Sequence, residues 1–562
     1  MRRATARTVT ALAAALVLFA LLLPNRLLRL TPGAFVRLPG EAVLGLAVLL
    51  LLRARTRRVA AVLGGLALGL LTLLKLVDMG FYAVLSRPFD LVLDWVLLDD
   101  AQEFLEGTAG STQALITVTG VAVAALLLLA LTTLAVVRLS SVAARHRATA
   151  APAVLVLGTV WIVSASFGAR VGDVTLAARS NAVLVGNRVD QVRAGLRDKE
   201  EFAEAAAVDR FRGTPGDRLL TGLRGKDVIF TFIESYGRHA LEDPSAAPEI
   251  GAVLGKGTRR LRDAGFAARS AWLTAPTTGA QSWLAHSTLL SGLWIDNQQR
   301  YRTLTSSSRL TLSRAFRRTG AWRTVGIMPG VTRAWPEGEF YGLDHVYDSR
   351  ELGYRGPEFS WTPVPDQFSL SAFERLEHGR PHRRPTMALV ILASSHNPWA
   401  PIPRMVGWDE IGDGSVFHAL KKAGKDPQEV WQDPDRVRTE YRRAIAYSLR
   451  SLISYVREYG DEDTVLVFLG DHQPVSTVVG RHASRDVPVT VVAHDPAVLD
   501  RISGWGWDGG LKPGPEAPVW RMDAFRDRFL AAFGPQPGLA PPRPARRPAA
   551  TAGSPPGFLP RR

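Results

Sequence analysis

The chain has 562 residues, a formal net charge of +16 and no cysteine. This length exceeds what a single hydrophobic core usually serves, so it predicts more than one structural unit. An apolar fraction of 47% excludes a wholly disordered chain. The lack of cysteine excludes disulfide scaffolds, thiolate zinc sites, iron–sulfur clusters and a cysteine nucleophile.

The first 176 residues have the composition of a membrane domain. Crossing a hydrocarbon core of about 30 Å requires roughly 20 mostly apolar residues in a helix. The segments that approach this length lie at about 9–28, 34–52, 59–77, 113–137 and 151–169. The second is the weakest, because Arg37 and Glu41 lie within it. We therefore predict a transmembrane bundle of five helices over residues 1–176.

The arginines of this region predict its orientation in the membrane. Clusters of arginine precede the first span and lie between the second and third and between the fourth and fifth. The loop after the third span is rich in acidic residues instead. Because positive charge is retained on the cytoplasmic side, the N-terminus is predicted to be cytoplasmic. Five spans then place everything after residue 170 outside the cell, as part of a multi-pass protein of the cell membrane.

Three further segments surround the main domains. Residues 88–106 mix apolar and acidic positions at helical spacing, which predicts an amphipathic helix on the outer membrane surface or under the soluble domain. Residues 177–223 predict linker helices. Residues 535–562 contain nine prolines, five arginines and no acidic residue, which predicts a disordered tail.

Most of the positive charge belongs to the two ends of the chain. Residues 1–176 hold 16 Lys and Arg against 9 Asp and Glu, and the tail holds five arginines. The region between them is therefore only mildly basic. No basic patch interleaved with aromatic residues is apparent, so the charge does not indicate nucleic-acid binding.

Residues 224–534 have the pattern of an α/β domain. Near-continuous apolar runs alternate with longer amphipathic segments and occupy residues 227–234, 322–328, 386–394, 463–470 and 487–493. Such runs are typical of strands buried on both faces of a mainly parallel sheet. We predict a three-layer α/β domain, with its helices supplying the crossovers.

Polar residues follow three of these predicted strands. Glu234 ends the first, His396 follows the third, and Asp471 and His472 follow the fourth. Ligands of parallel sheets collect beyond the carboxyl ends of the strands, and carboxylates together with imidazole suit a divalent metal ion. Taken singly, Glu234 could be a capping acid and Asp-His a turn. Together they favour a metal site.

A hydroxyl-rich segment at 273–292 offers a nucleophile for metal-assisted group transfer. Thr278 precedes Gly279 at a predicted junction between a loop and a helix, where free N–H groups and the helix dipole favour anions. A hydroxyl beside a divalent ion can attack phosphorus or sulfur. The structural alternative is that Thr277, Thr278 or Ser282 caps the helix.

These motifs resemble those of the alkaline phosphatase/sulfatase superfamily, most closely its membrane-bound branch of lipoteichoic acid synthases and phosphoglycerol transferases. The resemblance covers the architecture of nearly the whole chain and the motifs of about residues 224–500. It implies an extracellular sulfatase-like domain with one divalent ion, Mn²⁺ first and Mg²⁺ or Zn²⁺ as alternatives. The residues that match the metal ligands of this branch are Glu234, Thr278, Asp471 and His472.

The resemblance leaves two registers for the nucleophile. Counting back ten residues from Thr288 places Thr278 where the synthase branch has its catalytic threonine. A sulfatase-style count, which uses the Leu-Leu-Ser-Gly that ends at Gly292, points to Ser282 instead. Thr278 is preferred, because the rest of the site resembles the synthase branch. The sulfatase motif with Cys or Ser, Pro and Arg is absent, which weakens a literal sulfatase interpretation.

The resemblance also implies substrate contacts. His396 matches the histidine that faces the substrate, and the segment around Trp335 resembles the substrate-binding region of the synthases. These enzymes carry an arginine two residues after the tryptophan, where this chain has Glu337. Either Arg333 takes the place of that arginine, or the substrate differs.

The predicted function is a membrane-anchored, metal-dependent transferase or hydrolase that acts on a lipid-linked or cell-envelope phosphoester through a phospho-threonine. Its partners would be a membrane lipid donor and an envelope glycan or lipid acceptor. The enzymatic alternative is a phosphatase, phosphodiesterase or sulfate-ester hydrolase. An alternative of another class is a catalytically inactive sensor or scaffold of the envelope.

Overall fold

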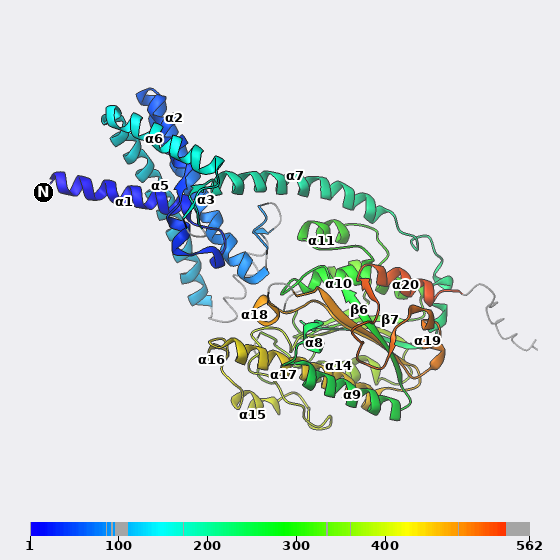
Figure 1. Cartoon of the computed structure of the whole chain (residues 1–562). Coiled ribbons are helices and arrows are strands. Elements are labelled where there is room, and N and C mark those ends of the chain that lie inside the picture. Colours follow the sequence, from blue (N-terminus) through cyan, green and yellow to red (C-terminus); the bar gives the residue numbers. More distant parts are fainter. Residues whose placement is uncertain are drawn as a thin grey trace, which may run out of the picture.

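A computed structural model describes residues 2–85, 87–91, 94–95, 111–171, 174–332, 335, 337–359, 361–480 and 483–535. It contains a group of N-terminal helices, a long connecting helix and an α/β domain (Figure 1). Most of the amphipathic helix predicted at 88–106, and nearly all of the predicted disordered tail, lie outside the described residues.

The N-terminal helices are α1 (Arg2–Leu22), α2 (Gly40–Leu51), α3 (Ala54–Leu85), α5 (Ser111–Arg145) and α6 (Arg147–Ser166). Among the described residues, four helical segments are long and apolar enough to cross a membrane: Ala4–Leu22, Ala54–Ala83, Ser111–Arg145 and Arg147–Ser166. Many of their large apolar side chains are exposed, as a lipid environment requires. This part of the chain has the length and composition of a membrane domain.

The segment predicted as the second span contains only a short helix. α2 has 12 residues, or about 18 Å of helix, which is shorter than a hydrocarbon core. Residues 38–39, inside the predicted span, are extended and pair with Ala177 and Ala178. The span predicted at 34–52 therefore stays a prediction.

Polar contacts join the connecting helix α7 (Ser180–Ala207) to the N-terminal helices. Glu41 of α2 accepts hydrogen bonds from the backbone N–H groups of Asn181 and Ala182, at 3.0 and 3.2 Å. Two turns further along, Arg188 donates to both carboxylate oxygens of Asp78 on α3, at 2.5 Å. A carboxylate at a helix N-terminus is stabilised by the helix dipole. The start of α7 is thus fixed to the membrane domain.

The α/β domain is built around one large sheet. Its strands are β5 (Asp227–Ile233), β6 (Ala267–Thr274), β7 (Arg323–Met328), β8 (His345–Asp348), β9 (Thr386–Leu392), β10 (Thr464–Gly470), β11 (Asp486–Ala493), β12 (Asp508–Gly509) and β13 (Val519–Arg521). The order is β12-β6-β11-β10-β5-β9-β7-β8, with β13 paired to β6. The run from β10 to β8 is parallel throughout. Among the described pairs of longer strands, the antiparallel ones are those that β11 forms with β10 and with β6. The mainly parallel sheet predicted from sequence is therefore confirmed.

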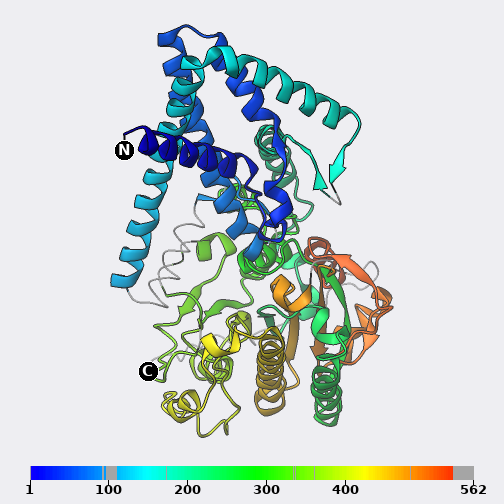
Figure 2. The same cartoon turned by 60° about the vertical axis from the view of Figure 1, so that its left-hand side comes forward.

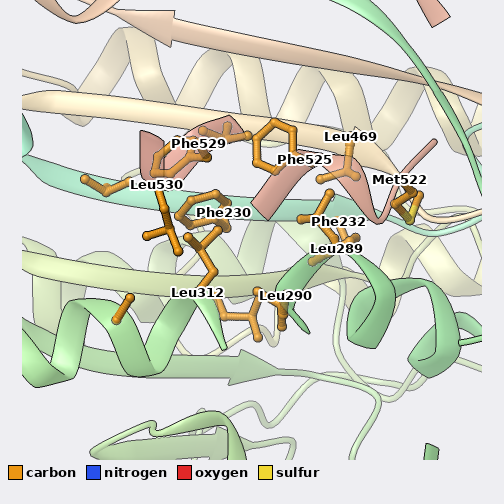
Figure 3. Close-up of a cluster of buried hydrophobic side chains, with 14 of the residues drawn as sticks. Phe230, Phe232, Leu289, Leu290, Leu312, Leu469, Met522, Phe525, Phe529 and Leu530 are labelled. Carbon is orange, nitrogen blue, oxygen red and sulfur yellow. The ribbon is translucent and has the colours of Figure 1, made fainter. Parts of the chain in front are cut away.

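Helices cover both faces of this sheet, which gives the predicted three layers. One layer contains α10 (Ser282–Ser291), α12 (Leu312–Thr319) and α20 (Ala524–Ala532), and the other contains α9 (Ala247–Asp263), α14 (Asp366–Phe373) and α17 (Pro434–Tyr459). Successive residues of a strand point to opposite faces. Phe230 and Phe232 of β5 therefore pack against the first layer (Figure 3), while Ile229 and Ile233 pack against the second.

The remaining helices and turns are short. They are η1 (Leu27–Arg29), η2 (Pro32–Phe35), η3 (Gly216–Arg218), η4 (Thr221–Leu223), α8 (His239–Glu242), α11 (Gln298–Thr305), α13 (Glu337–Tyr341), η5 (Glu374–His378), α15 (Phe417–Lys422), α16 (Pro427–Val430), α18 (Ser476–Val479), α19 (Pro496–Asp500) and η6 (Ser503–Trp505). The short strands outside the main sheet are β1 (Leu38–Pro39), β2 (Arg170–Val171), β3 (Val174–Thr175) and β4 (Ala177–Ala178). Of these elements α18 is the most informative, because it follows β10 and lies on the side of the α/β domain nearest to the membrane helices in both views (Figures 1 and 2).

A buried carboxylate, Asp366, joins α14 to its neighbours. One oxygen accepts a hydrogen bond from the N–H of Ser394 at 2.9 Å, and the other accepts one from the hydroxyl of Ser448 at 2.5 Å. Burial raises the pKa of Asp366 from 3.8 to about 6, although these hydrogen bonds oppose the rise. The folded chain therefore holds this proton more tightly than the unfolded chain, and stability is expected to fall as pH rises from about 4 to about 6.

Asp366→Asn is expected to remove this part of the pH dependence. The amide oxygen still accepts from Ser394, and the amide N–H₂ group donates to Ser448, so packing is kept. The wild type should lose on the order of 3 kcal/mol of unfolding free energy between pH 4 and pH 7 that the variant does not lose. Thermal unfolding of both proteins in detergent across this range measures the difference, and parallel curves would exclude Asp366 as its source.

Candidate active site

The predicted metal ligands lie at the carboxyl ends of two neighbouring strands. β5 and β10 are parallel, with Ile233 opposite Gly470, so the next residues, Glu234 and Asp471, lie side by side. Gly470 is required here, because a Cβ would come within 1.8 Å of the backbone oxygen of Tyr236. The structure brings together ligand atoms that all lie within 4.8 Å of one another, from the buried side chains of Glu234, Asp471 and His472.

Hydrogen bonds fix which atoms of this cluster are free to bind a metal ion. Oδ1 of Asp471 accepts from the backbone N–H groups of Ser235 and His472, at 2.8 and 2.7 Å. Its Oδ2 is buried and has no hydrogen-bond partner among the described residues. Nδ1 of His472 lies 2.8 Å from the carbonyl of Gln473, which can only accept, so Nδ1 carries the proton. Nε2 is then the ligand atom of His472. In metal-binding histidines, a hydrogen bond from the other ring nitrogen commonly fixes the tautomer in this way.

The electrostatics of the cluster call for a positive charge between its members. Burial raises the pKa of Glu234, and the neighbouring charge of Asp471 raises it further. Burial lowers the pKa of His472, but Asp471 and Glu234 outweigh this effect and raise it overall. Two buried carboxylates this close repel each other unless a cation neutralises them. The free Oδ2 of Asp471, the unprotonated Nε2 of His472 and the excess of negative charge all fit a divalent ion.

The hydroxyl of Ser282 lies in this cluster. Its Oγ donates to Oε2 of Glu234 at 2.7 Å and is 3.2 Å from Nε2 of His472. Ser282 is the first residue of α10, and Gln281 before it has a left-handed backbone with φ of 67°. Gly279 also has a positive φ, of 81°. These two positive angles turn the chain sharply between β6 and α10 and place the helix start at the metal ligands.

Thr278 lies beside the cluster through its backbone. It pairs with Gln473 in an isolated parallel bridge, and the N–H of the following Gly279 donates to the carbonyl of Gln473 at 2.8 Å. None of the hydrogen bonds of the described residues involves the Thr278 hydroxyl. The structure thus places Ser282, the residue indicated by the alternative register, in contact with Glu234 and His472. The choice between the two hydroxyls stays a prediction.

Of the predicted substrate residues, His396 lies near the cluster. His396 follows β9, and a charge on its ring would oppose the rise in the pKa of Glu234. Its ring stacks on Trp361, with centroids 4.0 Å apart, and Trp361 is 39% exposed. Trp335 instead stacks on Tyr341 at 5.4 Å, and Arg333 lies outside the described residues.

The sequence interpretation missed Trp361, because no strand end or known motif marks it. For His286 it indicated only a structural role or a supporting role beside the site. His286 follows Ser282 by one helical turn and has its Nε2 3.8 Å from Oδ2 of Asp471. An i, i+4 relation to the candidate nucleophile is the signal that could have drawn attention to this histidine.

Comparison with known proteins gives distant similarity to solved structures. No family model and no curated protein match the chain. The lipoteichoic acid synthase LtaP from Listeria monocytogenes matches at 15% identity and a TM-score of 0.36, over 61% of this chain and 78% of LtaP. A protein in the alkaline phosphatase superfamily from Vibrio parahaemolyticus matches at 15% identity and a TM-score of 0.35, over 60% of this chain and 75% of that one.

The zinc complex of the C-terminal periplasmic domain of EcEptC from Escherichia coli also matches. The identity is 14% and the TM-score 0.37, over 55% of this chain and 83% of that domain. These solved structures come from the group of proteins that the sequence motifs resemble. At such identities and TM-scores they assign no activity to this chain, so the function is argued from the site itself.

Proposed function

We propose that the chain is a membrane-anchored, metal-dependent enzyme of the alkaline phosphatase/sulfatase type that transfers or hydrolyses a phosphoester through a covalent intermediate on Ser282. One observation carries this proposal. The hydroxyl of Ser282 donates to Glu234 inside a buried cluster of two carboxylates and one imidazole, at the carboxyl edge of a mainly parallel sheet. Thr278 is the alternative nucleophile.

Glu234, Asp471, His472 and the attacking hydroxyl would hold the divalent ion. When bound, the ion would lower the pKa of that hydroxyl and offset the negative charge of the ester. Mn²⁺, Mg²⁺ and Zn²⁺ are all compatible with two carboxylates and one imidazole.

The residues of the chain supply the steps of transfer. Oγ of Ser282 passes its proton toward Oε2 of Glu234, which already accepts its hydrogen bond at 2.7 Å. Oγ then attacks phosphorus, the bond to the leaving alcohol breaks, and a phospho-serine forms. An acceptor hydroxyl or water attacks the same phosphorus and releases Ser282. His396 would bind an ester oxygen or return a proton to the leaving alcohol.

A lipid donor suits the position of the site. α18 follows Asp471 and His472 and lies on the side of the α/β domain that faces the N-terminal helices (Figures 1 and 2). A membrane-anchored enzyme meets lipid substrates at a high effective concentration. By the arginine distribution of its loops, the domain would face the outside of the cell, where an envelope glycan, a lipid or water is the acceptor.

A substrate panel on the purified full-length protein tests this function. The substrates are p-nitrophenyl phosphate, bis-p-nitrophenyl phosphate, p-nitrophenyl sulfate and phosphatidylglycerol in mixed micelles, each with Mn²⁺, Mg²⁺ or Zn²⁺. We expect metal-dependent turnover of the phosphoesters, with release of diacylglycerol from the lipid. Turnover of the sulfate alone would favour the sulfate-ester hydrolase, and a protein that binds no metal and turns over no substrate would be the inactive scaffold.

A further inference from the structure

His286 and Asp471 present two unsatisfied buried atoms to each other. Nε2 of His286 and Oδ2 of Asp471 are both buried and lack a hydrogen-bond partner among the described residues. The two atoms are 3.8 Å apart. A hydrogen bond between nitrogen and oxygen has a length of about 2.9 Å, so a shift of about 1 Å would satisfy both groups at once.

The carboxylate of Asp471 has little freedom to move away from this contact. Its Oδ1 is fixed by the backbone N–H groups of Ser235 and His472. The orientation of Oδ2 is therefore set by the strand end, and His286 faces it from α10.

The ring of His286 is also held in place. It packs on Phe232 of β5, with ring centroids 4.2 Å apart and an interplanar angle of 46°. Because residues four apart lie on one face of a helix, His286 projects from the same side of α10 as Ser282. α10 thus carries both the candidate nucleophile and a group aimed at a metal ligand.

His286 is placed to act through Asp471 rather than as a further ligand. The ligand atoms of Glu234, Asp471 and His472 converge within 4.8 Å, and His286 does not belong to that set. Carboxylates that bind metal ions usually accept a further hydrogen bond, and removing such a contact commonly weakens metal binding roughly 10- to 100-fold.

We propose that His286 is a positioning residue whose Nε2–H donates to Oδ2 of Asp471 and thereby sets the affinity of the Glu234–Asp471–His472 cluster for its divalent ion. This inference rests on the proposed function, since it presumes that the cluster binds a metal ion. It adds a residue that determines how tightly the ion is held and that couples the position of α10 to the ligands.

The test compares four variants of the full-length protein in detergent. His286→Phe keeps the ring and its packing on Phe232 but removes the donor. His286→Gln places an amide N–H at nearly the reach of Nε2, whereas His286→Asn is too short. His494→Phe is the matched control, because His494 also packs on a phenylalanine, Phe266, and follows the antiparallel strand β11.

The readout is the dissociation constant for Mn²⁺ and for Zn²⁺, measured by equilibrium dialysis with elemental analysis. We expect His286→Phe and His286→Asn to weaken binding roughly 10- to 100-fold. His286→Gln and His494→Phe should stay within about threefold of the wild type. We expect the metal-free His286→Gln and His286→Asn variants to unfold at similar temperatures. A difference in metal affinity between these two variants then reflects the reach of the donor and not a difference in packing.

Three results would overturn the proposal. Equal affinity of the wild type and His286→Phe would show that the contact does not matter, and equal weakening in the Gln and Asn variants would show that only the ring matters. A wild type that binds no divalent ion at all would overturn the proposed function together with this inference. Metal binding that persists unchanged in the variants would overturn the inference alone.

Discussion

Ser282→Ala is expected to lower the rate of group transfer by roughly 1,000-fold or more, the size of effect seen when a nucleophile is removed. The variant loses the hydroxyl that donates to Glu234 and lies 3.2 Å from Nε2 of His472. The fold should be kept, because Ser282 opens α10 without a role in the apolar core. Initial rates with bis-p-nitrophenyl phosphate at saturating Mn²⁺ measure the loss.

Thr278→Val is the matched control for this prediction. It removes the other hydroxyl and keeps the volume and β-branching of the side chain. We expect Thr278→Val to retain activity within about tenfold. Mass spectrometry of acid-quenched wild type should find the added phosphoryl group on Ser282 and not on Thr278. The reverse pattern in the two variants would establish Thr278 as the nucleophile.

Removal of the divalent ion is expected to abolish activity and to destabilise the protein. Without a cation, Glu234 and Asp471 are buried carboxylates with ligand atoms within 4.8 Å of each other, and their repulsion opposes folding. At a free-ion concentration about 100 times the dissociation constant, binding adds about 2.7 kcal/mol of stability. For a domain of this size, this corresponds to a rise of roughly 4 °C in unfolding temperature.

Chelation followed by stepwise return of Mn²⁺, Mg²⁺ or Zn²⁺ measures both effects on the same sample. In Asp471→Asn, which removes one charge and weakens the ligand set, chelation should leave the unfolding temperature nearly unchanged. Full activity in a preparation that contains no metal by elemental analysis would contradict the prediction. The ion that restores the most activity identifies the preferred metal.

The strands that hold the site were predictable because they are buried on both faces. All residues of β5 and β10 are buried, so their sequences are apolar without interruption, and the polar residue that follows marks the strand end. Two such strands in parallel bring their carboxyl ends to one edge, and this was enough to expect Glu234 near Asp471.

Strand direction was not predictable in the same way. β11 is also an apolar run, but it is antiparallel to β10, with Ala493 opposite Val465. The residue after it, His494, therefore lies at the other edge of the sheet, away from the metal ligands. Local composition does not encode direction, because it depends on how the connecting segments cross the sheet. β6 was missed as well, since its first three residues are not buried and its sequence includes Arg269.

The register of the nucleophile depended on the turn before α10. Residues 275–281 contain two positive φ angles, at Gly279 and Gln281, and a glutamine in this conformation leaves no signal in the sequence. The helix consequently begins at Ser282, four residues after Thr278, and the irregular turn at 279–281 separates the two candidate hydroxyls. The span predicted at 34–52 contains only the 12-residue helix α2, because residues 38–39 join an extended pair with residues 177–178.

The attachment of α7 has a consequence for which substrates the proposed enzyme can reach. Because Glu41 and Asp78 hold the first turns of this 28-residue helix, it is a stiff spacer of about 42 Å rather than a flexible tether. A stiff connection would hold the candidate site at a fixed position relative to the N-terminal helices. An insertion of four residues in the middle of α7 would lengthen the spacer by about 6 Å and rotate the domain by about 40°. Such an enzyme would keep its turnover of soluble esters while losing that of lipids in its own membrane.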